Sequence, residues 1–171
     1  GRYKIWIYNS VSGKHKKIYE KGESLEQEID YSYPVIDWHP SNEILGFITE
    51  EKGRLFIHYY NIKKEELTTR RLLRFDKILD MEFSPDRRKI VFSAINKGQT
   101  DIYLYDIAAA TREQITNDIA DDFNPRFINN MNEISFASNR RNDTIFSPGA
   151  DPVNNTTTAF SIYVYNLKTR S

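Results

Sequence analysis

The feature that most constrains the fold of this chain is a repeat with a step of about 45 residues. Three aromatic anchors are separated by 45 and then 44 positions: Trp38, Phe83 and Phe127. A second set of anchors keeps the same two steps: Phe47, Phe92 and Phe136. A fixed period of this length is the signature of repeat architectures, in which each unit is one supersecondary structure. We therefore expect a stack of similar units.

Each unit contains four short strand-like segments. The third segment is an apolar and aromatic run closed by Asn or Asp, at residues 5–9, 57–61, 102–106 and 162–166. Such runs are typical of buried strands that end in a turn. A more polar fourth segment follows at residues 14–19, 66–72 and 112–116. Four strands in about 45 residues is the size of a β-propeller blade. The sequence thus predicts an all-β fold of four-stranded antiparallel blades, with the aromatic positions packed between blades.

The strand count divides the chain into four parts. We predict a partial blade at residues 1–32, blades at 33–76 and 77–119, and a partial blade at 120–171 with a loop insertion at 141–159. Closed propellers have about four to eight blades. The chain is therefore expected to be a segment of a larger six- to eight-bladed propeller, or to pair with a second chain, since an open array would expose apolar faces.

The second full unit resembles the TolB-like, or PD40 (WD40-like), propeller repeat. The resemblance rests on Phe-Ser-Pro-Asp at 83–86, Phe-Ser at 92–93, Asp-Ile-Tyr at 101–103 and Gln-Ile-Thr at 114–116, and the next unit adds Ser-Asn-Arg at 138–140. The sequence departs from the pattern in two places. Arg87 replaces the usual Gly after Pro-Asp, and no Gly follows Arg140.

This resemblance implies a non-catalytic scaffold that binds another protein, in the bacterial periplasm and with an envelope protein as partner. Similar propellers also cover the active site of prolyl-oligopeptidase-like serine peptidases, which makes a substrate-gating domain the alternative. A third hypothesis is an enzyme that uses the propeller face, as in some lyases. That reading requires converging carboxylates or a metal near the central channel.

The amino-acid composition argues against several classes of function. Lys plus Arg and Asp plus Glu are both 24, so there is no basic excess for a nucleic acid. The chain has no cysteine, which excludes thiol nucleophiles and Cys–zinc sites. No apolar run approaches the roughly 20 residues that span a bilayer, so membrane insertion is not expected. The chain begins at Gly1 without a signal-like segment, as expected of a processed or trimmed product.

The search for chemistry yields no catalytic residue, cofactor site or metal site. The three histidines, His15, His39 and His58, lack metal-ligand spacing, so structural or surface roles are expected. Asp101 is expected to accept hydrogen bonds from a neighbouring loop. The acidic cluster Asp118, Asp121 and Asp122 could bind a cation, but it lacks the pattern of a calcium loop and is interpreted as a solvated connector.

The insertion at 141–159 is the local irregularity. Long loops within compact domains are usually functional or disordered, and both readings stay open here. Ile145 and Phe146 give the loop an apolar tip, and Pro148 and Asp151 lie in its turn-forming part. These four residues are the predicted partner-contact loop.

Overall fold

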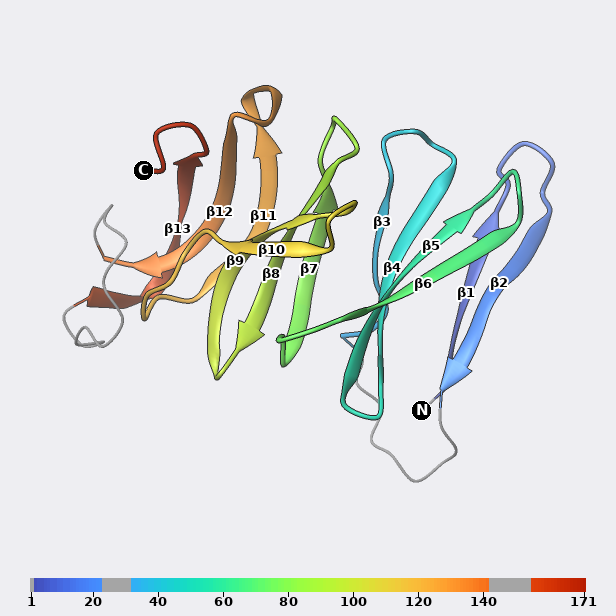
Figure 1. The fold of residues 1–171 in the computed structure, drawn as a ribbon, viewed down its shortest axis with the longest axis horizontal. Coiled ribbons are helices and arrows are strands. Elements are labelled where there is room, and N and C mark those ends of the chain that lie inside the picture. The colour runs from blue at the N-terminus through green and yellow to red at the C-terminus, as the bar shows by residue number, and fades with distance from the viewer. Residues whose placement is uncertain (1, 23–31, 142–154) are drawn as a thin grey trace.

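The structure is a computed structural model, which describes residues 2–22, 32–141 and 155–171. In it the described parts of the chain form four antiparallel sheets that lie side by side (Figure 1). The first sheet has two strands: β1 (Arg2–Tyr8) and β2 (His15–Gly22). The second has four: β3 (Val35–Trp38), β4 (Ile44–Glu51), β5 (Arg54–Asn61) and β6 (Glu66–Leu72).

The third sheet repeats the order of the second. It contains β7 (Lys77–Phe83), β8 (Lys89–Asn96), β9 (Gln99–Asp106) and β10 (Thr111–Gln114). The fourth contains β11 (Asp122–Ile128), β12 (Glu133–Arg140) and β13 (Thr156–Asn166), with one 3-10 turn, η1 (Asn129–Met131), between its first two strands. The predicted all-β architecture of four-stranded antiparallel blades is confirmed. The first four residues of β13, 156–159, come from the region predicted as a loop insertion.

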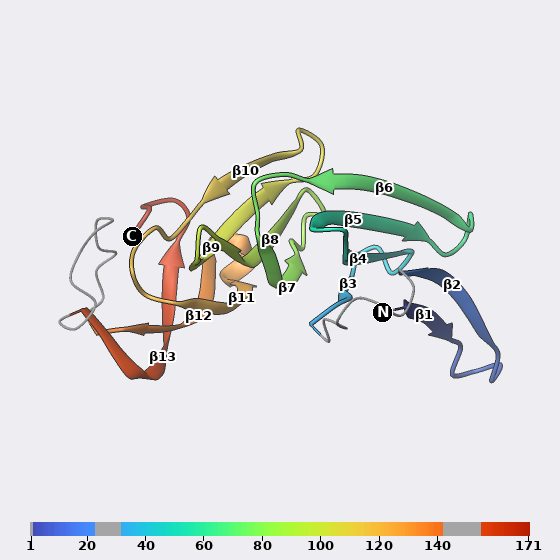
Figure 2. The same cartoon turned by 90° about the horizontal axis from the view of Figure 1, so that it is seen from below.

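The array is curved, and the strand order sets which strands lie inside the curve. Seen at right angles to the first view, β3, β7 and β11 lie towards the inside, and β6 and β10 lie on the outer rim (Figure 2). β6 is exposed at every position except Leu72. β9, by contrast, is buried from Thr100 to Tyr105. The predicted contrast between a charged rim strand and a buried aromatic third strand therefore holds in the two four-stranded sheets. It is wrong for the third strands of the outer sheets, because Trp6 and Tyr8 on β1 and most of β13 are exposed.

Turns between strands follow the chemistry of their side chains. Asn9 and Asn166 each accept, through Oδ1, the backbone N–H groups two and three residues ahead, at 2.8–3.0 Å. In the turn after β7, Ser84 Oγ donates to Asp86 Oδ1 at 2.6 Å. Arg87 in the same turn has φ 70°. This left-handed conformation favours glycine, which explains why the repeat pattern has Gly at that position.

Three apolar clusters join neighbouring sheets, and we name the interfaces by their place in the chain. The N-terminal interface lies between the β1–β2 and β3–β6 sheets, the central interface between β3–β6 and β7–β10, and the C-terminal interface between β7–β10 and β11–β13. The third strands alternate at these interfaces. In β9, Tyr103 and Tyr105 face the central interface, and Ile102 and Leu104 face the C-terminal one.

Close packing at the central interface depends on a glycine. The Phe83 ring lies so near Gly46 that a Cβ at residue 46 would be 2.4 Å from ring carbons Cε2 and Cζ. Any side chain at residue 46 would therefore overlap the ring. Phe83 is 3% exposed as a result.

One expectation about the aromatic residues is wrong in part. Phe47, Phe83, Phe92 and Phe136 are buried as predicted, but Phe127 is only partly buried and Trp38 is 47% exposed. Trp38 occupies the same repeat position as Phe83. It differs because no described strand covers it from the side of β1 and β2, whereas β4 covers Phe83.

Candidate functional site

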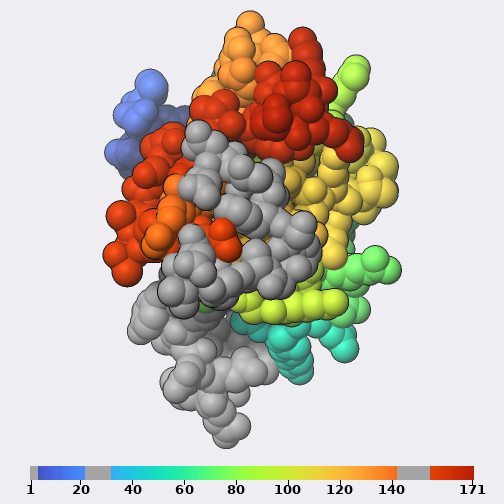
Figure 3. Space-filling view, turned by 90° about the vertical axis from the view of Figure 1, so that its left-hand side faces the viewer, coloured from blue at the N-terminus to red at the C-terminus, as the bar shows by residue number. Residues whose placement is uncertain are grey.

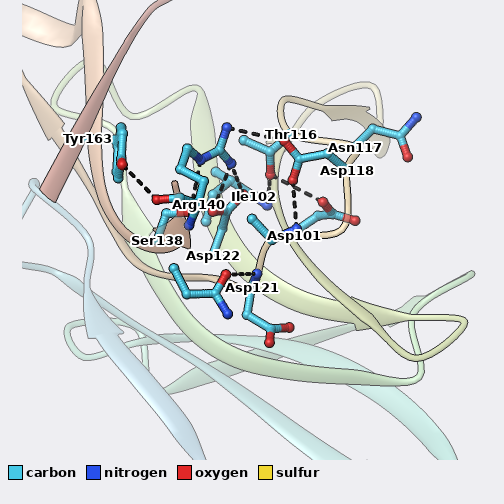
Figure 4. Close-up of polar contacts among 12 residues, drawn as sticks. Asp101, Ile102, Thr116, Asn117, Asp118, Asp121, Asp122, Ser138, Arg140 and Tyr163 are labelled. Carbon is cyan, nitrogen blue, oxygen red and sulfur yellow. Dashed lines mark hydrogen bonds and ion pairs between the residues drawn. The ribbon is translucent and has the colours of Figure 1, made fainter. Parts of the chain in front are cut away.

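The most polar buried site in the described part of the chain surrounds the guanidinium of Arg140 (Figure 4). Its Nη2 donates to both carboxylate oxygens of Asp122, at 2.9 and 2.8 Å. Its Nη1 lies 3.2 Å from Asp118 Oδ2, and its Nε donates to Ser138 Oγ at 2.9 Å. All four residues are buried. The guanidinium also lies 5.4 and 5.5 Å from the ring centroids of Phe136 and Tyr163, as in cation–π contacts.

The strand pattern places these groups together. β12 alternates in burial, so Ile134, Phe136, Ser138 and Arg140 all lie on its buried face. Asp122 begins β11, which pairs with β12 so that Asp122 is opposite Ser138. Burial raises the pKa of the Asp122 carboxyl, although the Arg140 charge opposes that rise. A buried guanidinium bonded to two carboxylates is a structural arrangement, because its donors are already in use.

Asp101, at the adjoining part of β9, has a different environment. Its Oδ2 accepts a hydrogen bond from Gln114 Nε2 at 3.0 Å, and its Oδ1 accepts one from Thr116 Oγ1 at 3.3 Å. The expectation that Asp101 accepts hydrogen bonds from a neighbouring loop is confirmed for Thr116, which follows β10, whereas Gln114 belongs to β10 itself. Burial, followed by the charges of Asp122 and Asp118, raises the pKa of Asp101 to about 7. The Asp101 side chain is 2% exposed.

The interpretation of the acidic cluster as a solvated connector is wrong for two of its three members. Asp118 is 4% exposed and Asp122 is 0% exposed, and both bind Arg140. Asp121 is the partly exposed member. The cation that these carboxylates bind is a side chain of the next strand. Within residues 2–22, 32–141 and 155–171, no group of three or more potential ligands could hold a metal ion.

The histidines take structural positions. His58 is buried in β5, with Nε2 2.9 Å from Thr49 Oγ1 and Nδ1 2.9 Å from Thr69 Oγ1. Burial lowers its pKa to about 4. His39 lies 2.8 Å from Ser41 Oγ through Nδ1, in the turn after β3. His15 is exposed, and its ring lies beside that of Trp6.

Carboxylates on the inner strands connect one sheet to the next. Asp37 Oδ2 accepts the backbone N–H of Phe83 at 2.8 Å. Glu82 Oε2 accepts the backbone N–H of Phe127 at 2.6 Å in the same way, 45 residues later. Burial is the main cause that raises the pKa of both carboxyl groups. Arg126 pairs with Asp80 at 2.6 Å on this side of the molecule. The inner carboxylates therefore hold strands in place.

The four predicted partner-contact residues, Ile145, Phe146, Pro148 and Asp151, lie outside the described residues. The structure reveals Arg140 as a central residue that the sequence analysis did not single out as a site. Its place on the buried face of an alternating strand was the available signal. An Arg at a core position requires an acidic partner. Among the described residues, no helix is long and apolar enough to cross a membrane.

Comparison with known proteins identifies the fold. TolB from Acinetobacter baumannii superposes with a TM-score of 0.64 at 12% identity, over 97% of this chain and 36% of that one. The tricorn protease gives a TM-score of 0.59 at 17% identity, over 96% of this chain and 16% of that one. Porphyromonas gingivalis dipeptidyl peptidase 4 gives 0.52 at 13% identity, over 96% and 28%. No protein-family model and no curated protein matches the sequence.

These likenesses define the class of protein by its fold. The chain has the β-propeller fold of the kind found in TolB and in peptidases, and it corresponds to about a third or less of the length of each of these three proteins.

Proposed function

We propose that this chain is part of a non-catalytic propeller that binds another protein in the bacterial periplasm, with an envelope protein as partner. The main support for the proposal is that the buried ionisable side chains bind other groups of the protein itself. Asp118, Asp122 and Arg140 bind one another, and Asp37 and Glu82 bind backbone N–H groups of the next sheet. These buried and half-buried charges thus fix strands within a blade or between neighbouring blades, as in a rigid support for surface loops.

The similarity to TolB supports this role, and so does the repeat that resembles TolB-like propellers. The division into a partial blade 1–32, blades 33–76 and 77–119, and a partial blade 120–171 belongs to the same proposal. So does partner contact through the loop at 141–159. The loops at the ends of rigid blades are the usual place for such contacts.

A second candidate function is the substrate-gating propeller of a prolyl-oligopeptidase-like serine peptidase. The specific observation in its favour is the fold similarity to the tricorn protease and to dipeptidyl peptidase 4. In that case the nucleophile would be in another part of the native polypeptide.

Labelling of the native polypeptide separates the two functions. The polypeptide that contains this chain would be purified from its source, sized by intact mass and treated with a fluorophosphonate, which reacts with activated serines. The scaffold proposal expects no labelling, together with capture of an envelope protein that weakens when residues 142–154 are replaced by a short Gly-Ser linker. A labelled serine would overturn the proposal in favour of the peptidase domain.

A further inference from the structure

The outer strand of the second sheet, β6, has an open edge. β6 is the last strand of a four-stranded sheet, and among the described strands it pairs with β5 alone. The next strand along the chain, β7, belongs to the third sheet, and both sheets that flank the second are present as well. The open edge is therefore a property of this blade, and it lies on the convex rim of the array (Figure 2). Such an edge presents backbone groups on which another strand can pair.

The rim strands of the neighbouring sheets carry features that discourage pairing with another strand. β2 contains three lysines, and its register with β1 is interrupted by a shift. Lysines and bulges both protect sheet edges. β10, which is drawn in yellow at the surface along one side of the array in Figure 3, is only four residues long. β6 differs from both, because it is seven residues long, contains no lysine or proline, and keeps one register with β5 throughout.

The charges of β6 are complementary to those of a second copy of the same strand. Two identical antiparallel strands related by a two-fold axis normal to the sheet have one residue that lies opposite itself. If that residue is Thr68, Glu66 of each copy lies opposite Arg70 of the other, on one face of the sheet. Opposite charges at such positions stabilise a strand pair, whereas like charges destabilise it. The two-fold axis repeats the contact, so one strand pair would contain this ion pair twice.

The neighbouring registers lack this complementarity. In the register centred on Thr69, both arginines of β6 lie opposite uncharged residues, Thr68 and Leu67, and no ion pair forms. In the register centred on Arg70, two like charges lie opposite each other. The register centred on Thr68 also places Leu67, which is 42% exposed, beside Thr69 of the other copy. The sequence of β6 therefore favours one register.

Glu66 and Arg70 are placed for contacts between copies. Both side chains are exposed. They are four residues apart on an extended strand, roughly 13 Å, so they are not neighbours within one chain. Arg70 donates through Nη1 to the backbone oxygen of Ile107 at 2.6 Å, which holds its side chain at the rim. A guanidinium has five N–H donors, so the same arginine can bind a carboxylate as well.

We propose that the edge of β6 is an interaction surface for a second copy of this chain. The two β6 strands pair antiparallel about a two-fold axis at Thr68, which joins two four-stranded sheets rim to rim, and Glu66 and Arg70 form ion pairs between the copies. A strand pair of this length buries little apolar surface, so the dimer is expected to be weak and sensitive to salt. The inference goes beyond the proposed function, because it concerns the rim and holds for either candidate function.

The test is sedimentation velocity of the native polypeptide that contains this chain, from micromolar to millimolar concentration. The expected result is a monomer–dimer equilibrium, with hydrogen exchange in β6 that becomes slower as the protein concentration rises. Glu66→Arg and Arg70→Glu each place like charges opposite each other, so each should lower the association constant by about tenfold or more. An equimolar mixture of the two variants restores opposite charges at both positions and should dimerise as wild type does.

Lys97→Glu, in the exposed turn between β8 and β9, is the control, because it changes the net charge as Arg70→Glu does. It should dimerise as wild type does. Three results would each overturn the proposal: a monomer at every concentration, a dimer that both charge reversals leave unchanged, or a mixture of the variants that does not regain the dimer. If a variant does not fold, exchange in the wild type decides, and β6 protection that is independent of protein concentration overturns the proposal.

Discussion

The central and C-terminal interfaces share one type of carboxylate–amide bond but differ in the side chains buried around them. At the central interface the described contacts are dominated by apolar side chains, and the fit of the Phe83 ring over Gly46 sets the closeness of the sheets. The C-terminal interface has a smaller apolar cluster, and beside it lies the buried set of Asp118, Asp122 and Arg140. The difference shows that equivalent sheets can be stabilised by close apolar packing between two sheets or by a buried ion set that fixes the strands of one sheet and the connector before it. The stability of the apolar packing should depend on side-chain volume. The stability of the buried ion set should depend on the loss of one charged partner and on pH.

The largest effect is expected from Arg140→Met. This change leaves two buried carboxylates without their cation, and breaking a buried ion pair typically costs about 3–5 kcal/mol. Chemical denaturation should show that loss in the free energy of unfolding. Arg71→Met, at an exposed position of β6, is the control and should change stability by less than about 0.5 kcal/mol. A stable Arg140→Met variant would show that this ion set does not hold the fourth sheet and its connector in place.

Gly46→Ala tests the volume dependence of the central interface. The added Cβ would meet the Phe83 ring at 2.4 Å, and overpacking of this kind costs about 1–3 kcal/mol. We expect a value near the upper end, measured as a lower free energy of unfolding. The double variant Gly46→Ala/Phe83→Leu removes the clash and should be more stable than the sum of the single changes predicts. Additive losses would contradict the close contact.

Asp101→Asn should change the pH dependence of stability. The native pKa of Asp101, about 7, exceeds the ordinary value of 3.8, so this group's contribution to the free energy of unfolding falls as pH rises from about 4 to about 7. His58 acts oppositely, because its pKa of about 4 lies below 6.5 and its contribution falls as pH drops through that range.

The two contributions offset each other in the wild type between pH 4 and 6.5. Asp101→Asn removes a contribution to the free energy of unfolding that rises as pH falls from 7 to 5, so the variant should lose about 2 kcal/mol relative to wild type over that range. Denaturation curves at both pH values measure this difference. Parallel pH profiles for the two proteins would contradict the raised pKa of Asp101.

The smallest effect is expected from Arg126→Gln, which removes an exposed ion pair across the C-terminal interface. The side chains of Arg126 and Asp80 are 47% and 22% exposed. Exposed pairs contribute up to about 1 kcal/mol and less at high salt. Lys63→Gln, which breaks the exposed pair with Glu43 within one sheet, should behave alike. A larger loss for Arg126→Gln in denaturation would show that surface charge also holds this interface.

The strands could be predicted from the sequence because the residue pattern that defines them is local. Anchors such as Phe83 and Phe92 recur at one step, and both proved to be core residues. The buried ionic site could not be read from Asp118 and Asp122, since their partner lies in a later strand. Trp38 was misjudged for a related reason: its exposure depends on what lies against it, whereas its sequence context is that of a core residue.

The two carboxylate–amide bonds on the inner strands have a consequence for how such an array can grow. Asp37 accepts the backbone N–H of Phe83, and Glu82 accepts that of Phe127. In both cases a carboxylate of one sheet fixes the position of the inner strand of the next sheet. Duplication of one unit of about 45 residues would copy both the carboxylate that accepts this hydrogen bond and the backbone N–H that donates it. At the same repeat position the fourth sheet has Arg126, a donor that cannot accept an N–H. Arg126 therefore cannot form the same carboxylate–amide bond to a following sheet. A blade beyond the fourth sheet would have to be held by a different contact.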